Sequence, residues 1–334
     1  MTYLIFERNN HMTTRFTKII CIIAAFAMIF TALCFTSCGD ESDTFTVGIC
    51  QLVQHEALDA ATEGFKTALK EKLGDKVTFT EQNASGDSAT CVTICNQFVT
   101  SGVDLIMANA TAALQAASAA TSKIPVIATS ITDYSSALDI DNWTGATGKN
   151  ISGTCDLAPL DTQAEMIKQL FPDANKVGIL YCSAEANSKY QVETITPLLA
   201  ALGYTVKSFT FADTNDVSSV TASACDECDV IYIPTDNTAA SCSGAIGSVC
   251  DSKNVPVFAG EEGLCRYCGA ATLTIKYYDI GYEAGLMAYE ILVNGADVST
   301  MDIRFAPVFT KKYNKAYCDK YGITVPSDWT ELDA

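Results

Sequence analysis

The fold class follows from the segment Phe45-Thr46-Val47-Gly48-Ile49-Cys50, because it opens a regular alternation of strand-like and helix-like segments. It is a short apolar run of the length of a buried strand, and residues 57–73 after it carry apolar side chains at helical spacing. Further buried strands are expected at 103–108 and 125–130, with helices between them. Short apolar strands that alternate with helices are typical of a parallel sheet covered on both faces.

The same pattern begins again in the second half of the chain. Val47-Gly48-Ile49 recurs as Val177-Gly178-Ile179, Asp104-Leu105-Ile106 recurs as Asp229-Val230-Ile231, and Pro125-Val126 recurs as Pro256-Val257. Each match is short enough to arise by chance, but the three occur in the same order at similar spacing. This favours two doubly wound lobes, in which ligands bind beyond the carboxyl ends of the strands. A cleft between two such lobes also permits hinge closure.

The chain length of 334 residues exceeds what one ordinary core requires and is comfortable for two lobes. We therefore predict an α/β fold of two doubly wound parallel-sheet lobes joined by a multi-segment hinge. Lobe 1 is expected to comprise residues 45–153 and about 278–300, because a helix from about Tyr278 to Leu292 should return to it. Lobe 2 is expected to comprise residues 154–277 and about 301–334.

The N-terminal segment has the features of a lipoprotein signal. Arg15 and Lys18 precede the apolar run 19–35, which the small residues Thr36 and Ser37 and then Cys38 follow. The arrangement resembles a lipobox, so we expect cleavage to remove residues 1–37 and a lipid to be attached to Cys38. Residues 38–44 would then be a polar tether, and the lipid anchor would hold the protein at the outer face of the cell membrane.

Two features leave other N-terminal processing open. Phe35 occupies the position at which a lipobox usually has Leu. The apolar run of about 17 residues is marginal for a membrane-spanning helix, so a retained anchor and simple secretion stay as alternatives. Met12 is an alternative start to Met1, because residues 1–11 only lengthen the basic part of the signal.

The charge and the cysteines bound the class of protein. A formal net charge of −18 disfavours nucleic acid as a partner. The 15 cysteines mostly sit singly within apolar stretches, as buried free thiols do. The pairs Cys225/Cys228 and Cys265/Cys268 leave a local disulfide or a zinc site open. Zinc is disfavoured, because the gap between the pairs is longer than in common zinc sites.

Polar residues gather where predicted strands pass into helices. They stand in the turns 83–87, 109–111, 183–188 and 235–238. Ser, Thr, Asn and Asp cap helices through free backbone N–H groups, and this is the structural alternative for each of them. Together, several helix N-termini around one cleft can hold a carboxylate, and cleft Asp residues can hold an ammonium group.

Catalytic and metal sites are not indicated. His55, after the first strand, is the one histidine beyond the signal segment, so a site with several His ligands cannot form. No Gly-x-Ser-x-Gly elbow accompanies it, and no Gly-rich phosphate loop is present. We therefore predict no enzyme activity, no catalytic residues, no metal and no cofactor.

Ordered motifs carry a resemblance to a known family. They are Val47-Gly48-Ile49 with Gln51, His55, Leu58 and Asp59; Asn150-Ile151-Ser152-Gly153 with Asp156-Leu157 and Pro159; Val177-Gly178-Ile179-Leu180-Tyr181 with Glu185 and Asn187-Ser188; and Pro234-Thr235-Asp236-Asn237-Thr238. From about Phe45 to Gly322 the chain resembles the tryptophan/tyrosine-type substrate-binding proteins of ABC transporters.

The resemblance implies a type I periplasmic-binding-protein fold, a permease and an ATPase as partners, and an aromatic or apolar amino acid as a plausible ligand. By position it also implies a set of cleft residues: His55, Asn109, Thr111, Asp156, Ser183, Glu185, Asn187, Ser188, Thr235, Asp236 and Asn237. We expect a monomer. A nucleoside or sugar ligand, and a ligand-sensing lipoprotein, stay as alternatives.

The chain departs from the family at Lys276, where the family usually carries an acidic or amide residue. A cation in the cleft would change the charge that the site prefers. Lys276 is therefore counted among the candidate ligand-binding residues, with a solvent-facing side chain as the alternative.

Overall fold

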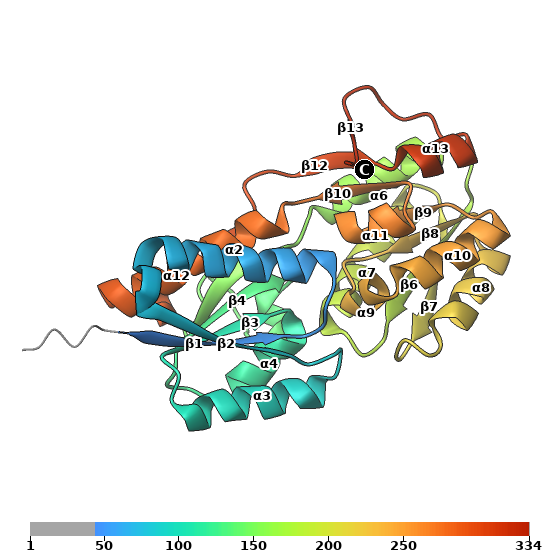
Figure 1. The fold of residues 1–334 in the computed structure, drawn as a ribbon. Coiled ribbons are helices and arrows are strands. Elements are labelled where there is room, and N and C mark those ends of the chain that lie inside the picture. Colours follow the sequence, from blue (N-terminus) through green and yellow to red (C-terminus); the bar gives the residue numbers. More distant parts are fainter. Residues whose placement is uncertain (1–43, 334) are drawn as a thin grey trace, which may run out of the picture. The chain divides into compact units, whose positions relative to one another are not determined.

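The computed structural model describes residues 44–333, in which two β-sheets form the centres of two lobes (Figure 1). The first sheet has the order β11-β5-β4-β3-β1-β2, and all its neighbouring strands run parallel. Its strands are β1 (Phe45–Gln51), β2 (Val77–Asn83), β3 (Leu105–Asn109), β4 (Val126–Ile131), β5 (Ile151–Cys155) and β11 (Arg304–Phe305).

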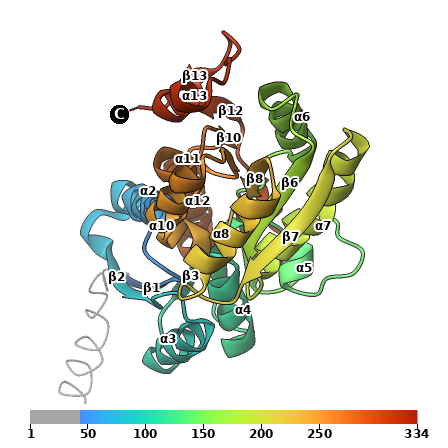
Figure 2. The same cartoon turned by 90° about the vertical axis from the view of Figure 1, so that its right-hand side faces the viewer.

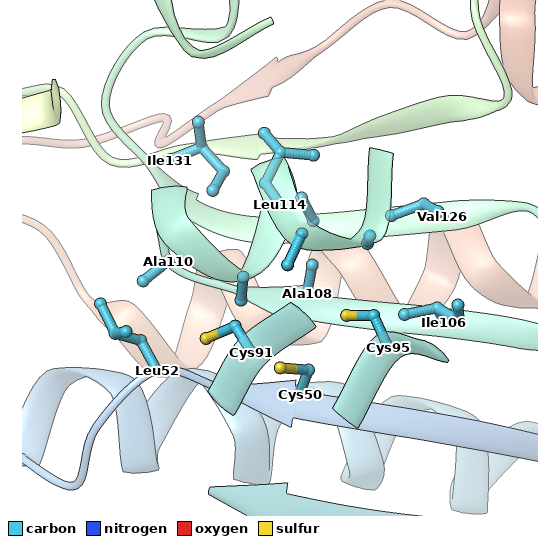
Figure 3. Packing of buried hydrophobic residues seen from close by; sticks show 14 of the residues in the cluster. Cys50, Leu52, Cys91, Cys95, Ile106, Ala108, Ala110, Leu114, Val126 and Ile131 are labelled. Atoms are coloured by element: carbon cyan, nitrogen blue, oxygen red, sulfur yellow. The ribbon is translucent and has the colours of Figure 1, made fainter. Parts of the chain in front are cut away.

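Helices cover both faces of the first sheet (Figure 1). They are α2 (Glu56–Leu73), α3 (Ser88–Ser101), α4 (Thr111–Ala120), α5 (Tyr134–Ala137) and α12 (Tyr277–Asn294), with short 3₁₀ turns at Gly74–Lys76 and Val298–Thr300. Successive residues of β1 serve opposite faces, as strand geometry requires. Ile49 packs with α2 and α12, whereas Cys50 packs with α3 and α4. Figure 3 shows Cys50 facing Cys91 and Cys95 of α3 in that second layer.

The second sheet repeats the arrangement of the first. Its order is β13-β12-β10-β9-β8-β6-β7, and only the β10–β12 pair is antiparallel. The strands are β6 (Lys176–Cys182), β7 (Thr205–Phe211), β8 (Val230–Ile233), β9 (Val257–Ala259), β10 (Ala271–Thr274), β12 (Thr310–Tyr313) and β13 (Thr330–Glu331). The helices are α6 (Leu160–Leu170), α7 (Ala186–Ala201), α8 (Val217–Glu227), α9 (Asn237–Ser241), α10 (Ser243–Lys253), α11 (Glu262–Tyr267) and α13 (Lys315–Tyr321) (Figure 2).

The predicted internal repeat is confirmed by strand order. The order β2-β1-β3-β4 in lobe 1 corresponds to β7-β6-β8-β9 in lobe 2. The repeated glycines lie at equivalent places in β1 and β6, and both lie under a covering helix. A Cβ at Gly48 would lie 2.6 Å from the ring of Phe98 in α3, and one at Gly178 would lie 3.0 Å from Cys228 Sγ at the end of α8. Glycine thus lets each helix approach its central strand.

The helix that returns to lobe 1 packs its backbone against α2. A Cβ at Gly64 would lie 2.1 Å from the carbonyl oxygen of Tyr278, and one at Gly281 would lie 2.0 Å from that of Ala61. Helices in such close contact have no room for side chains at the crossing. The glycines of α2 and α12 therefore allow α12, from the C-terminal part of the chain, to pack closely on the first lobe.

Sheet membership differs slightly from the predicted lobe boundaries. The strand β5 extends lobe 1 to Cys155, beyond the predicted end at 153. The expectation that residues 301–334 belong to lobe 2 is wrong for Arg304–Phe305, because β11 pairs with β5. That pair is only two residues long, so no periodic pattern announces it. Both β12 and β13 lie in the second sheet.

The predicted signal peptide at 1–37, Cys38 and nearly all of the tether lie outside the described residues. Between residues 44 and 333, none of the helices combines the length and the apolar character that crossing a bilayer requires. All 12 cysteines in this range are free, and all but Cys242 are buried. The same range brings together no group of three or more side chains suited to a metal ion.

Candidate functional site

A cavity of about 190 Å³ lies between the two lobes, at the carboxyl ends of the strands. Lobe 1 contributes residues that follow β1, β2 and β3, and lobe 2 contributes residues that follow β6, β7 and β8. This is the position at which doubly wound sheets bind ligands. The lining comprises Leu52, Val53, Ser85, Gly86, Ser88, Thr111, Ala112, Gln115, Cys182, Ala184, Glu185, Ala186, Asn187, Ala212, Asp213, Thr214, Asn237, Thr238 and Ser241.

The charged side chains of this lining are negative, and all of them belong to lobe 2. Glu185 and Asp213 are carboxylates, both in lobe 2, and the lining contains no Lys or Arg. Asp213 is exposed on the loop after β7, where its Oδ1 accepts a bond of 2.8 Å from Asn215 N. A cavity with this charge favours a ligand that carries a positive group.

Glu185 organises the lobe 2 wall of the cavity. Its Oε1 accepts bonds of 2.7 Å from both the backbone N and the Oγ1 of Thr238. Its Oε2 accepts bonds from Asn237 N at 3.1 Å, Asn237 Nδ2 at 2.8 Å and Asn187 Nδ2 at 3.0 Å. Five donors therefore fix the carboxylate at the start of α9, where it keeps Asn187 and Asn237 in the cavity wall.

Asp236 lies behind this wall rather than in it. The residue is 1% exposed and does not line the cavity. It accepts bonds from Cys182 N at 2.7 Å, Ser188 Oγ at 2.7 Å and Ala239 N at 2.8 Å, so it caps α9 and ties it to β6. Burial, together with the charge of Glu185, raises the pKa of Asp236 to about 8.

Two helices begin at the cavity without a side-chain cap. Thr111 and Ala112 open α4 in lobe 1, and Ala186 and Asn187 open α7 in lobe 2. The N-cap of α4 is Ala110, which has no side-chain acceptor and adopts φ 88°. The first N–H groups of a helix have no intrahelical partner and carry the positive end of its dipole. These two helix starts can therefore receive an anionic group.

His55 lies at the edge of the site, where the lobes meet. Its Nε2 is 3.2 Å from Asn237 Oδ1 in the opposite lobe, and burial lowers the pKa of its imidazole. His55 does not line the 190 Å³ cavity. It lines a neighbouring hollow of about 330 Å³, and Ser241 borders both spaces. The His55–Asn237 contact thus lies between the two spaces.

An ion pair links the lobes beside His55. The guanidinium of Arg266, in α11, reaches both carboxylate oxygens of Glu56 in α2, at 3.2 and 3.3 Å. Glu262 also contacts Arg266 at 3.4 Å and accepts a bond of 2.9 Å from Lys312. Within residues 44–333, Glu56–Arg266 is the one ion pair that crosses from one lobe to the other.

Four of the twelve predicted ligand residues line the cavity: Thr111, Glu185, Asn187 and Asn237. Asn109, fully buried, donates to Leu58 O at 2.8 Å and to Thr62 Oγ1 at 2.9 Å, while its Oδ1 has no partner. Asp156 lies at the crossing between lobes and accepts bonds of 3.1 Å from Thr132 Oγ1 and Tyr277 OH. Burial raises the pKa of Asp156 to about 6.

The remaining predicted residues support the site from outside it. Ser183 donates to Phe211 O at 3.2 Å, Ser188 donates to Asp236, and Thr235 donates to Gly260 O at 3.3 Å. Lys276 is exposed at the start of α12 and does not line the cavity. The departure from the family at this position therefore adds no cation to the cavity.

The predicted turns include Ser85 but leave out Leu52, Val53, Asp213 and Thr214 of the lining. These four lie one to three residues after a strand end, so the rule that ligands bind at strand ends could have found them. Asp213 and Thr214 follow β7 in the same way as the predicted residues follow β6 and β8.

Comparisons with known proteins agree with this architecture. Residues 46–331 match the family described as ABC transporter substrate binding protein. A protein of Clostridioides difficile (strain R20291) named tyrosine-binding protein is 35% identical over 270 residues, which are 79% of this chain and 78% of the relative.

Two solved structures are similar at nearly equal identity. The ABC domain from Streptococcus pneumoniae in complex with L-Trp is 30% identical, with a TM-score of 0.82, over 86% of this chain and 99% of that one. The ligand-free, open structure of a substrate-binding protein with adhesive properties from Clostridium difficile is 32% identical over the same shares, with a TM-score of 0.65. The structure thus resembles the L-Trp complex more closely than the open form.

These matches confirm the predicted fold class, two type I lobes of alternating α and β elements. They also confirm the resemblance that the ordered motifs indicated. With the family matched over nearly the whole described chain, the protein belongs to the substrate-binding proteins of ABC transporters.

Proposed function

We propose that the protein captures an aromatic L-amino acid, tyrosine or tryptophan, between its lobes and delivers it to the permease and ATPase of an importer. The relative named tyrosine-binding protein and the structure with L-Trp support this ligand class. The protein would act as a monomer and would bind its ligand without chemical change.

The distribution of charge in the cavity carries the proposal. The two carboxylates, Glu185 and Asp213, lie in lobe 2, whereas the uncapped start of α4 at Thr111 lies in lobe 1. An amino acid has an ammonium group and a carboxylate that complement these two walls. We assign the ammonium group to the lobe 2 wall, where Asp213 is the more exposed acceptor. The ligand carboxylate would lie at the start of α4.

A ligand held in this way would favour lobe closure, because its two charges interact with different lobes. Thr111, Asn187 and Asn237 would contact it from the wall. The apolar side chain would pack on Leu52 and Val53 and on the small alanines of the lining. The lining contains neither Phe, Tyr nor Trp, so a ligand ring would not stack on an aromatic side chain. The small residues of the lining leave the space for it.

Isothermal titration calorimetry with matched analogues tests this assignment. We expect L-tyrosine or L-tryptophan to bind, and the analogues that lack the ammonium group or the carboxylate to bind at least 30-fold more weakly. Loss of one partner of a desolvated charge pair costs about 2–5 kcal/mol. Equal affinity for the deaminated analogue would refute the ammonium subsite. Tighter binding of a sugar or nucleoside would refute the ligand class.

We also propose that the protein is held at the outer membrane face by a lipid on Cys38. The proposal rests on the basic residues, the apolar run and the small residues that precede Cys38 in the sequence. Cys38→Ser should therefore release the protein from the membrane fraction and abolish its labelling by a fatty-acid probe. Cys21→Ser, within the apolar run, is the matched control and should change neither. Membrane retention and labelling of Cys38→Ser equal to the unaltered protein would contradict the anchor.

A further inference from the structure

Two cysteine side chains from different helices meet in the core of lobe 2. Cys225 in α8 and Cys250 in α10 have their Sγ atoms 3.6 Å apart. The two helices lie side by side (Figures 1 and 2) and share a hydrophobic cluster. Neither cysteine lines the cavity between the lobes. The pair therefore has no part in the ligand site described above.

We propose that Cys225 and Cys250 are an oxidation-sensitive pair that a peroxide converts into a disulfide. In the first step the Cys225 thiolate attacks a peroxide oxygen, the O–O bond breaks, and Cys225 becomes a sulfenic acid while one water leaves. In the second step Cys250 attacks the sulfur of Cys225, the S–O bond breaks, and a second water leaves. The two thiols lose two electrons and two protons, and hydrogen peroxide is reduced to two waters.

The surroundings of the two thiols give them different roles. The hydrogen bond between the sulfurs lowers the pKa of Cys225 and raises that of Cys250. Burial and the charge of Asp226 oppose this effect on Cys225, and the charge of Lys253, which pairs with Asp226, partly offsets them. Cys225 is 7% exposed and Cys250 is 1% exposed. A small peroxide thus meets Cys225 first, and Cys250 is the resolving thiol.

The geometry favours this pair over the C-x-x-C pair that the sequence suggests. Cys228 lies after the end of α8 and points toward β6, because a Cβ placed at Gly178 would lie 3.0 Å from its Sγ. Cys225 points instead to α10. A disulfide between α8 and α10 would close a loop of 25 residues and constrain the unfolded chain.

Mass spectrometry of the peroxide-treated protein tests the proposal. The fully reduced protein is treated with hydrogen peroxide, blocked with an alkylating agent under denaturing conditions, and digested. We expect a peptide pair linked through Cys225 and Cys250, together with a melting temperature raised by roughly 5 °C, which a reducing agent reverses.

Three serine variants define the roles. Cys225→Ser should give no link, and Cys250→Ser should leave a sulfenic acid on Cys225 that dimedone traps. Cys228→Ser, the matched control from the same segment, should link as the unaltered protein does. The melting temperature of each reduced variant verifies that it folds. A Cys225–Cys228 link in the unaltered protein would overturn the proposal, and so would a pair that stays reduced while other cysteines oxidise.

Discussion

Asp236 lies in a turn predicted to face the cleft, but its side chain does not line the cavity. Its position after a buried strand predicts a residue at the cleft, and helix capping is the alternative role. The structure shows the cap, because three donors from β6, α7 and α9 surround its carboxylate. Glu185 occupies the cavity wall instead. Sequence position identifies the turns at the strand ends, but only packing decides which of their carboxylates faces the cavity.

The buried carboxyl group of Asp236 predicts a pH dependence of stability. Its pKa rises from 3.8 in the unfolded chain to about 8 in the folded protein, because of burial and the charge of Glu185. The folded state therefore retains a proton that the unfolded state has lost, and stability falls as pH rises from about 4 to 8. The expected result is a melting temperature that decreases over this range.

Asp236→Asn separates this group from the other titrating residues. The variant should melt at a lower temperature, because the amide nitrogen that replaces one carboxylate oxygen cannot accept the bond from Cys182 N, and its pH dependence should be shallower. Affinity for the ligand should stay within about threefold. Asp216→Asn, an exposed control whose side chain makes no cap bond, should leave the pH profile unchanged. An unaltered slope in Asp236→Asn, or a 30-fold loss of affinity, would contradict the role of a buried cap.

At the scale of elements, α2 and α11 are the parts of the two lobes that the ion pair Glu56–Arg266 connects. The pair is partly exposed and bidentate, and it lies outside the cavity lining. Exposed pairs contribute about 0.2–1 kcal/mol. Because it joins the two lobes, we expect this contact to favour their closure and so to act on the opening equilibrium rather than on the ligand itself.

Arg266→Ala should therefore raise the ligand Kd about two- to fivefold, mainly through faster dissociation. Lys207→Ala, which removes an ion pair to Glu227 inside lobe 2, is the matched control and should leave Kd unchanged. Stopped-flow fluorescence gives the rates, and solution scattering of the free variant should show a more open average. Equal dissociation rates in Arg266→Ala and Lys207→Ala would exclude an effect of the Glu56–Arg266 pair on lobe closure.

At the scale of the whole molecule, the periodic features were predictable and the local ones were not. The repeat of Val-Gly-Ile at Val47 and Val177 predicts two equivalent lobes, because each glycine sits where a helix must approach a central strand. The order of the strands follows from this repeat. The strand β11 was not predictable, because two residues carry no period. The contact between Cys225 and Cys250 depends on how α8 packs on α10. The sequence of either helix alone does not predict this packing.

For the site, the sequence predicted which turns line the cavity, but not which way their side chains point. Strand ends predict the turns that line the cavity, and Thr111, Glu185, Asn187 and Asn237 lie in its lining. The side chain of each capping residue has two possible directions, toward its own helix or toward the cleft, and local sequence does not distinguish them. Asn109, Ser188 and Asp236 turn inward and hold the wall in place.

Native mass spectrometry shows whether the space between the lobes selects an aromatic amino acid. The protein, unfolded and refolded to remove any carried molecule, is offered an equimolar mixture of L-tyrosine, L-tryptophan, L-leucine, glucose and adenosine. We expect a monomer that carries one molecule of tyrosine or tryptophan. A monomer that carries leucine, glucose or adenosine, or that stays empty, would refute the proposed ligand class.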